Sequence, residues 1–208
     1  PEGFRRRLAL GAAVCAGLLW AVVPLPGPAA LHSGVSIYAQ MIKEANLRPE
    51  EFRGSGGEQL MYSEDGREAS VAVWGDGARG NSLVVNGKLD AGGHAVMATR
   101  TLAGHLPVLL GGVSAGRRAF VIGLGSGVTA AAVARHPFSE VVVAELEPAV
   151  ARAARLFEHV NRGVMRDPRV NLRLEDARAL LRTEHGRFAL VVSEPSNPWL
   201  AGMPHLFS

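Results

Sequence analysis

The chain has 208 residues, of which 48% are hydrophobic and 20% are charged, which excludes an intrinsically disordered protein. The net charge is +3, and the basic residues are scattered apart from Arg5-Arg-Arg7, so nucleic-acid binding has no specific support. The single cysteine, Cys15, excludes a disulfide framework within this sequence. The seven histidines show no metal-ligand spacing, so we expect no bound metal.

The N-terminal stretch predicts a membrane helix. Leu8 to Leu31 contains no charged residue, and Leu8 to Val23 is close to the lower length limit for a bilayer-spanning helix. A signal-peptide core or a buried helix would also fit this pattern, although the chain does not begin with Met. We assign residues 1–32 to a probable transmembrane helix and linker, and we expect the chain to be a fragment of a longer, membrane-associated polypeptide.

The side of the membrane is less simple to assign. Arg5-Arg-Arg7 before the helix would remain cytoplasmic and send the following domain outside. The motifs later in the chain nevertheless favour a location inside the cell. Upstream helices could override the local arginines, so we expect the domain that follows to lie in the cytoplasm without resolving the conflict.

A small antiparallel β-domain is predicted next. Residues 33–56 read as a short helix and a polar linker, and residues 57–115 as the β-domain with a connecting helix. The expected strands are Gln59–Tyr62, Ala69–Trp74, Ser82–Val85 and Lys88–Ala91. Asn86-Gly87 is a strong signal for a type I′ hairpin turn.

The connecting helix is expected over Met97–Leu110. Its leucines recur at helical spacing, which predicts that Leu102, Leu106 and either Leu109 or Leu110 are buried.

The most informative stretch is a glycine-rich segment behind a short apolar run. Ala119 to Ile122 is continuously apolar, as expected of a parallel strand that is buried on both faces. Gly123, Gly125 and Gly127 predict a tight turn that lets a ligand approach the backbone. Val128 to Arg135 then reads as a helix whose first N–H groups are unpaired.

A second buried strand, Val141 to Ala144, ends at Glu145. An acid about 20 residues past such glycines is placed to accept hydrogen bonds from ribose hydroxyls. Gly127 comes one position early for the pattern Gly-x-Gly-x-x-Gly, which favours an S-adenosylmethionine-type ligand over NAD. We therefore predict an α/β fold of the Rossmann-like, S-adenosylmethionine-dependent methyltransferase type over residues 116–208, incomplete at its C-terminal end.

Two more acids follow later strands. Val170 to Leu174 alternates as a strand and leads to Asp176, followed by the small residue Ala177. This acid can accept a hydrogen bond from an adenine amino group, act as a helix N-cap, or do both. Phe188 to Val192 is predicted as a fourth buried strand and leads to Glu194 in a polar loop. Because parallel strands end at one edge, we expect both acids to lie beside the ribose-binding one.

Several motifs occur in an order that is specific. They are Tyr62-Ser-Glu-Asp-Gly, Leu83-Val-Val-Asn-Gly-Lys, Gly104-His-Leu-Pro, Ile122-Gly-Leu-Gly-Ser-Gly, Glu145-Leu-Glu-Pro, Asp167-Pro-Arg-Val, Glu175-Asp176, Ser193-Glu-Pro-Ser-Asn-Pro and Leu206-Phe-Ser. From about Ser33 to Ser208 the chain thereby resembles the spermidine/spermine synthase family, closest to bacterial members with preceding transmembrane helices. The family fold is a small N-terminal β-domain followed by a methyltransferase-like Rossmann domain. The resemblance also implies that the protein could form a homodimer.

The family transfers an aminopropyl group from decarboxylated S-adenosylmethionine to a di- or polyamine and releases methylthioadenosine. The resemblance implies that Glu194 is the catalytic base, although the family has Asp at this position. It implies that Glu145 binds ribose and that Asp176, with Ala177, binds adenine. The implied nucleoside cradle comprises Gly123, Gly125, Ser126 and Gly127.

The amine side departs further from the family pattern. The resemblance implies that Asp90, Thr99 and Asn197 face the amine substrate. Asn197 replaces an aspartate there, and Ser126 replaces an aspartate that holds the aminopropyl amine. Thr99 and Arg100 stand where a Tyr-Gln pair is expected, and Arg100 would repel a polycation.

Three functions remain open from the sequence. The ordered motifs favour an aminopropyltransferase acting on an amine. Asn197-Pro198-Trp199 resembles a clamp in some methyltransferases, and Ser126 suits a ligand that keeps its carboxylate, so S-adenosylmethionine-dependent methyl transfer is the second hypothesis. The altered amine side motivates the third, a non-catalytic nucleoside-binding module tethered to a membrane.

Overall fold

The computed structural model describes residues 27–35, 37–44, 46, 58–75, 80–184, 186 and 188–193. The predicted membrane helix, Leu8 to Val23, lies outside these residues, as do Glu194 and Asn197. Within the described ranges, no helix is both long enough and apolar enough to cross a membrane. Two short helices, α2 (Pro28–Leu31) and α3 (Ala39–Glu44), precede the first sheet.

The first sheet is an antiparallel meander of four strands in the order β1-β2-β3-β4. The strands are β1 (Gln59–Asp65), β2 (Ser70–Gly75), β3 (Asn81–Val85) and β4 (Lys88–Ala91). Asn86 and Gly87 have φ values of 49° and 77°, and a type I′ turn requires positive φ at both central residues. The predicted meander and hairpin are therefore confirmed.

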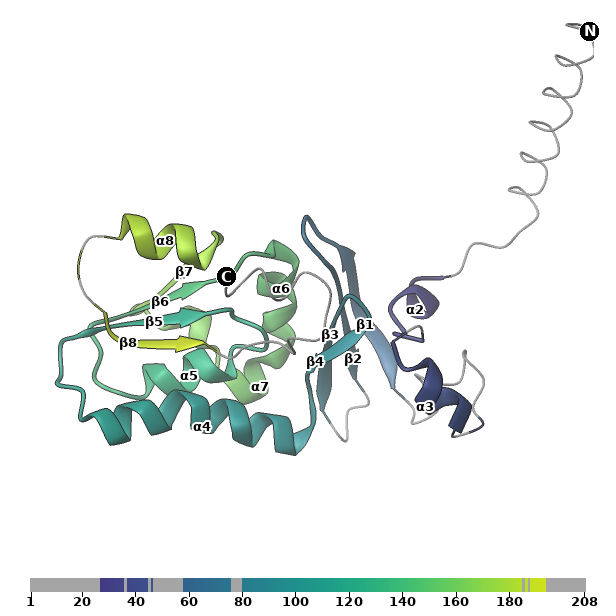
Figure 1. Cartoon of the computed structure of the whole chain (residues 1–208), viewed down its shortest axis with the longest axis horizontal. Coiled ribbons are helices and arrows are strands. Elements are labelled where there is room, and N and C mark those ends of the chain that lie inside the picture. Colours follow the sequence, from purple (N-terminus) through teal and green to yellow (C-terminus); the bar gives the residue numbers. More distant parts are fainter. Residues whose placement is uncertain are drawn as a thin grey trace, which may run out of the picture.

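The second sheet is parallel and has the order β7-β6-β5-β8. The strands are β5 (Arg118–Ile122), β6 (Glu140–Ala144), β7 (Val170–Arg173) and β8 (Phe188–Ser193). After β5 the chain proceeds outward through β6 and β7, and it then returns to the other side of β5 as β8. Ligands of open α/β sheets bind at such a reversal, outside the carboxyl ends of the strands. The arrowheads of β5, β6 and β8 point toward the antiparallel sheet (Figure 1).

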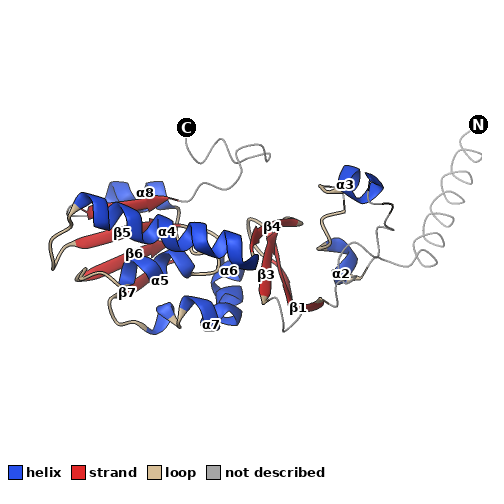
Figure 2. Ribbon diagram, turned by 90° about the horizontal axis from the view of Figure 1, so that it is seen from below, coloured by secondary structure: helices blue, strands red, loops and turns tan. Residues whose placement is uncertain are grey.

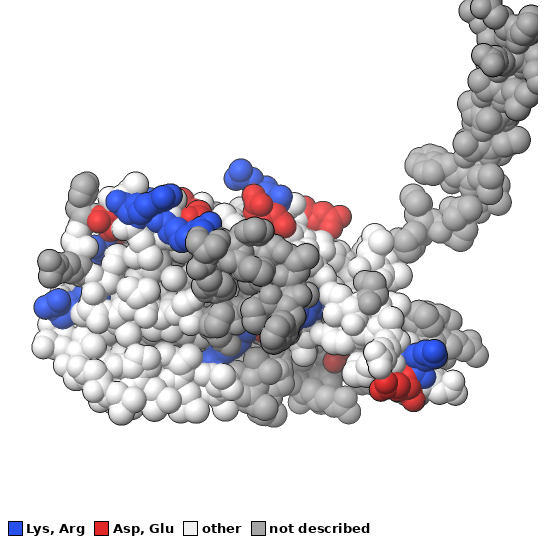
Figure 3. All heavy atoms as spheres, viewed as in Figure 1, with Lys and Arg blue, Asp and Glu red and all other residues white. Residues whose placement is uncertain are grey.

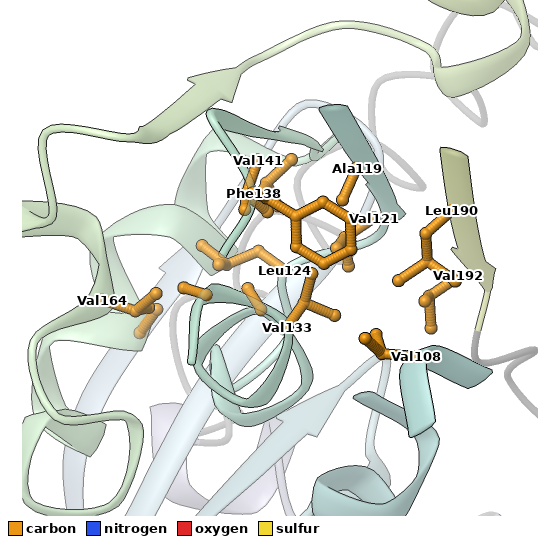
Figure 4. Close-up of a cluster of buried hydrophobic side chains, with 14 residues drawn as sticks. Val108, Ala119, Val121, Leu124, Val133, Phe138, Val141, Val164, Leu190 and Val192 are labelled. Carbon is orange, nitrogen blue, oxygen red and sulfur yellow. The ribbon is translucent and has the colours of Figure 1, made fainter. Parts of the chain in front are cut away.

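Alternate residues of the parallel strands enter two core clusters on opposite faces. Ala119, Val121, Val141 and Val143 lie in one cluster, together with side chains of α4 (Gly93–Gly111) and α5 (Val128–Ala134) (Figure 4). Phe120, Val142 and Ala144 lie in the other, with Leu180 of α8 (Ala177–Thr183). Burial on both faces explains why these strands are continuously apolar, which confirms the predicted α/β sheet.

The leucines of α4 are a correction to the sequence prediction. Leu102, Leu106, Leu109 and Leu110 are exposed by 51%, 44%, 69% and 84%. The helix approaches α5 through Gly104 instead, where a Cβ atom would lie 2.5 Å from the Cβ of Ala132. Because α4 and α5 pack closely at these small residues, the leucines of α4 face outward. The helix crosses the parallel strands (Figure 2), and the part of its surface that is visible at the lower edge of Figure 3 shows no charged side chain.

The two sheets meet through α6 (Pro148–Ala153) and the 3-10 helix η2 (Ala154–Phe157). Val71, Val73 and Leu83 of the antiparallel sheet share a buried cluster with Val150 and Phe157. The chain then continues through α7 (Glu158–Asn161) and the 3-10 helix η3 (Val164–Arg166) to β7.

Glu147 strengthens this joint between the sheets. Its Oε1 accepts a hydrogen bond from Ala149 N at 2.8 Å, and its Oε2 accepts from Glu68 N at 2.7 Å and from Ala69 N at 3.2 Å. A Cβ atom on Gly66 would lie 2.2 Å from Oε1 of Glu147, so only glycine fits at that turn. One carboxylate thus connects the β1–β2 turn to the start of α6.

Candidate functional site

The turn after β5 depends on its three glycines. Gly123, Gly125 and Gly127 have φ values of 83°, 52° and 82°, a backbone region that residues with a Cβ atom adopt with difficulty. Gly127 N donates to Leu124 O at 2.8 Å, which closes the turn before α5 begins. The sequence therefore produces a compact loop at the carboxyl end of β5, where it was predicted.

Glu145 holds this loop in place. The residue follows β6 and is 8% exposed. Its Oε2 accepts a hydrogen bond from Leu124 N at 2.8 Å, and its Oε1 accepts from Glu147 N at 2.9 Å. Because a carboxylate has about four acceptor positions, Glu145 retains capacity for a further donor such as a ribose hydroxyl.

The environment of Glu145 changes its acidity. Burial raises the pKa of the Glu145 carboxyl above its ordinary value, and the hydrogen bonds from the backbone N–H groups of Glu147, Leu124 and Gly125 oppose this rise. The negative charge of Asp90 raises the pKa further. Asp90, in β4 of the antiparallel sheet, therefore acts electrostatically on an acid of the parallel sheet.

Asp176 lies at the same edge of the sheet, beyond β7. It is the N-cap of α8, and its Oδ1 accepts a hydrogen bond from Ala179 N at 2.8 Å. Ala177 begins the helix and packs, partly buried, against the cluster around Leu180. The predicted role of Asp176 as a helix N-cap is therefore confirmed, and its adenine-binding role stays a prediction.

Ser126 is completely buried within the glycine loop. Its hydroxyl makes no hydrogen bond to any described residue. Its backbone carbonyl accepts a hydrogen bond from Asn161 Nδ2 at 2.8 Å, and the same nitrogen donates to Ala154 O at 2.9 Å. Asn161 Oδ1 accepts from Gly163 N at 2.9 Å. Asn161 therefore positions the loop from the far end of α7.

Asp90 and Arg100 face the glycine loop from the N-terminal side. The Nη2 atom of Arg100 donates to the backbone carbonyl of Asp90 and lies 3.7 Å from the Oδ2 atom of the same residue. A Cβ atom on Gly125 would lie 2.9 Å from Arg100 Nη1 and 3.6 Å from Asp90 Oδ2. The Arg100 and Asp90 side chains are 10% and 25% exposed. Thr99, the third residue predicted on the amine side, is exposed on α4.

The structure thus brings together most of the predicted residues that it describes. The glycine loop, Glu145 and Asp176 follow β5, β6 and β7, which are adjacent in the sheet. Glu194 and Asn197 follow β8 in the chain but lie outside the described residues. The sequence analysis did not single out Asn161. Asn161 lies two residues before Gly163, and no periodicity or motif in the sequence indicated its hydrogen bond to Ser126.

Comparisons with known sequences agree with the predicted resemblance. The chain is 26% identical to the spermidine synthase of Dictyostelium discoideum over 142 residues, which cover 68% of this chain and 49% of that protein. It is 38% identical to a polyamine aminopropyltransferase of Nitrosomonas europaea over 97 residues, or 46% of this chain and 29% of the relative. The chain therefore spans at most about half the length of these curated relatives. No family model matches the sequence.

Solved structures give the same fold. A spermidine synthase in complex with the transition-state analogue AdoDATO superposes with a TM-score of 0.63 at 20% identity, covering 72% of this chain and 51% of that one. The spermidine synthase of Thermotoga maritima gives 0.58 at 18% identity, covering 65% and 47%. The fold is that of the spermidine synthases. It combines a Rossmann-like methyltransferase sheet with an antiparallel sheet, as predicted.

Proposed function

We propose that the protein is a polyamine-type aminopropyltransferase, which moves an aminopropyl group from decarboxylated S-adenosylmethionine to an amine acceptor. One observation carries the proposal: the glycine loop, Glu145 and Asp176 follow three adjacent parallel strands at one edge. That edge lies at the reversal of strand order, where this class of sheet binds nucleotides. The named relatives, all spermidine synthases or aminopropyltransferases, support the same activity.

In this proposal the nucleoside lies across the edge of the sheet. Glu145 accepts hydrogen bonds from the ribose hydroxyls, and Asp176 uses its second oxygen for the adenine amino group while its first caps α8. Ala177 provides the small surface beside the base. The backbone of Gly123, Gly125, Ser126 and Gly127 forms the cradle, with the tail of the nucleoside directed toward Asp90 and Arg100.

The chemistry needs orientation and a base. A sulfonium makes its adjacent carbon electrophilic, so an amine nitrogen can attack that carbon while the C–S bond breaks and its electron pair stays on sulfur. The attacking ammonium must first lose a proton, and we assign that role to Glu194. Asp90, Thr99 and Asn197 are assigned to the acceptor amine. No metal takes part in this scheme.

We also propose that Leu8 to Val23 tethers the catalytic domain to a membrane, with the domain on the cytoplasmic side. The apolar sequence and the resemblance to membrane-fused members support this arrangement. The same resemblance supports a fragment of a longer chain and a homodimer.

The proposal is tested by incubating the full chain with decarboxylated S-adenosylmethionine and a panel of amines. We expect methylthioadenosine to appear, as measured by chromatography. Glu194→Gln should abolish its release while nucleoside binding survives, because only the base is lost. Equal turnover by the variant would contradict the assignment of the base. Formation of S-adenosylhomocysteine from S-adenosylmethionine, without methylthioadenosine, would instead establish methyl transfer.

A further inference from the structure

The Arg100–Asp90 pair presents both signs of charge beside the glycine loop. Arg100 Nη1 lies next to Gly125, and Asp90 Oδ2 lies on the same side of the loop. The two side chains are only 3.7 Å apart, and both are largely buried. Charges in such surroundings are weakly screened, so a ligand end at this place meets a strong local field.

The Arg100–Asp90 pair offers little electrostatic attraction to a diamine, which carries only positive charges. The other acid beside Asp90 is Glu145, whose carboxylate is engaged by the backbone N–H groups of Leu124 and Glu147. The guanidinium of Arg100 offsets the charge of Asp90, and Ser126 contributes only a neutral hydroxyl. A polycation would therefore gain little net attraction from the Arg100–Asp90 pair itself.

A group that carries an ammonium and a carboxylate together would match both charges. A guanidinium offers paired N–H donors whose geometry fits a carboxylate. A neutral amide in the same place would offer neither the charge nor the paired donors. The carboxylate of Asp90 would accept from the ammonium, and its 3.7 Å separation from Arg100 Nη2 is longer than a direct hydrogen bond.

We propose that Arg100 and Asp90 form a subsite for the ammonium–carboxylate end of a substrate. Arg100 binds the carboxylate, Asp90 binds the ammonium, and the pair determines which substrate is accepted. The inference rests on the nucleoside site of the proposed function, because it places the subsite at the reactive end of that site. A donor that keeps its carboxylate would replace the decarboxylated donor proposed above. The zwitterionic end can belong to the sulfonium donor, as in S-adenosylmethionine, or to an amino-acid acceptor.

Two pairs of ligands distinguish whether the zwitterionic end belongs to the sulfonium donor or to the acceptor. Calorimetry on the full chain compares S-adenosylmethionine with its decarboxylated form, which differ only in the carboxylate. A second titration, with the protein saturated by methylthioadenosine, compares ornithine with putrescine, which differ in the same way. We expect the carboxylated member of one pair to bind about 10–100-fold more tightly, the range for a hydrogen-bonded charge pair.

Arg100→Gln should remove this preference, and Arg100→Lys should retain a smaller one because it keeps the charge without the paired donors. Arg118→Gln is the matched control. Arg118 also pairs with carboxylates, those of Glu140 and Glu184, but it begins β5 at the opposite edge of the sheet. Its substitution should leave the preference unchanged.

Methylthioadenosine has no tail, so its affinity reports whether each variant keeps a folded nucleoside site. A preference that is absent in the unaltered protein, or that persists in both Arg100 variants, would overturn the subsite. If Arg100→Gln does not fold, an undiminished preference in Arg100→Lys would overturn it as well. Failure of the unaltered protein to bind methylthioadenosine would contradict the proposed function itself, and the subsite with it.

Discussion

Glu145 and Glu147 stand two residues apart, and both are almost fully buried, yet they belong to different kinds of site. Glu147, at the joint between the sheets, accepts hydrogen bonds from Ala149, Glu68 and Ala69. Burial alone would raise its pKa, but these donors and the N–H of Arg67 hold the pKa of Glu147 below its ordinary value. Glu145 has fewer such donors, and its pKa is raised.

The difference in backbone donors between Glu147 and Glu145 distinguishes a carboxylate that stabilises the fold from one that can bind a ligand. A buried carboxylate whose acceptor positions are filled by its own chain strengthens the fold. A buried carboxylate with acceptor positions left over is less stable as an ion and gains most when a ligand supplies the remaining donors. This contrast assigns a structural role to Glu147 at the joint and fits the binding site that we propose around Glu145, although both acids lie in the same turn.

The largest expected effect is at the joint. Glu147→Ala leaves the backbone N–H groups of Ala149, Glu68 and Ala69, and that of Arg67, without their charged acceptor, and we expect the free energy of unfolding to fall by about 3–4 kcal/mol. Denaturant titration measures this loss. Glu158→Ala is the control, because its ion pair with Arg166 is exposed and its removal should cause no measurable change. A small effect at Glu147 would mean that the sheets do not depend on this carboxylate.

Glu145→Gln tests the other acid. The amide keeps one acceptor but turns N–H donors toward a backbone N–H, so we expect a loss of about 1–3 kcal/mol in stability. Binding of methylthioadenosine should fall below detection in calorimetry, because both the ribose contacts and the loop geometry suffer. A variant that binds the nucleoside normally would remove Glu145 from the site.

The pH dependence of binding follows from the raised pKa of Glu145. The folded protein keeps this proton to higher pH than the unfolded chain does, so lowering the pH through this pKa relieves a cost to stability. Binding responds in the opposite direction, because the neutral acid accepts ribose hydrogen bonds less well. We expect the affinity for methylthioadenosine to fall as the pH is lowered from about 8 to about 5. Affinity that is constant over this range would contradict the prediction.

Asp176→Ser separates the two roles of Asp176. Serine caps helices about as well as aspartate, so stability should change by less than about 0.5 kcal/mol. The contact with adenine would be lost, and nucleoside affinity should fall about tenfold. Asp176→Ala removes the cap as well and should cost about 1 kcal/mol in stability. Unchanged affinity in both variants would leave Asp176 with the capping role alone.

The smallest effect is expected at Ser126. Its buried hydroxyl makes no hydrogen bond within the described part of the chain, so Ser126→Ala should leave stability unchanged or raise it by less than about 1 kcal/mol. Thermal unfolding without ligand measures this directly. A clear loss of stability would show that the hydroxyl has a partner in the folded protein.

The sequence predicted what depends on local backbone chemistry. The glycines with positive φ, the turn at Asn86-Gly87 and the acids at strand ends follow from rules that act over a few residues. These rules also gave the parallel sheet, since its buried strands are continuously apolar.

Contacts between distant segments could not be predicted in the same way. The exposed leucines of α4 look like a buried face until Gly104 is seen against Ala132 of α5. His105 Nδ1 lies 2.9 Å from His136 Nε2, although 31 residues separate the two in the chain. Such contacts depend on how helices pack, which periodicity within one helix does not specify.

The carboxylate of Glu147 also affects how the protein unfolds. It accepts hydrogen bonds from the β1–β2 turn of the antiparallel sheet and from the first turn of α6, which follows β6 of the parallel sheet. These segments therefore cannot separate without breaking hydrogen bonds to a charged group. The two sheets should therefore open as a single cooperative unit, and the amide protons of β1 and β2 should exchange with solvent no faster than those of β5.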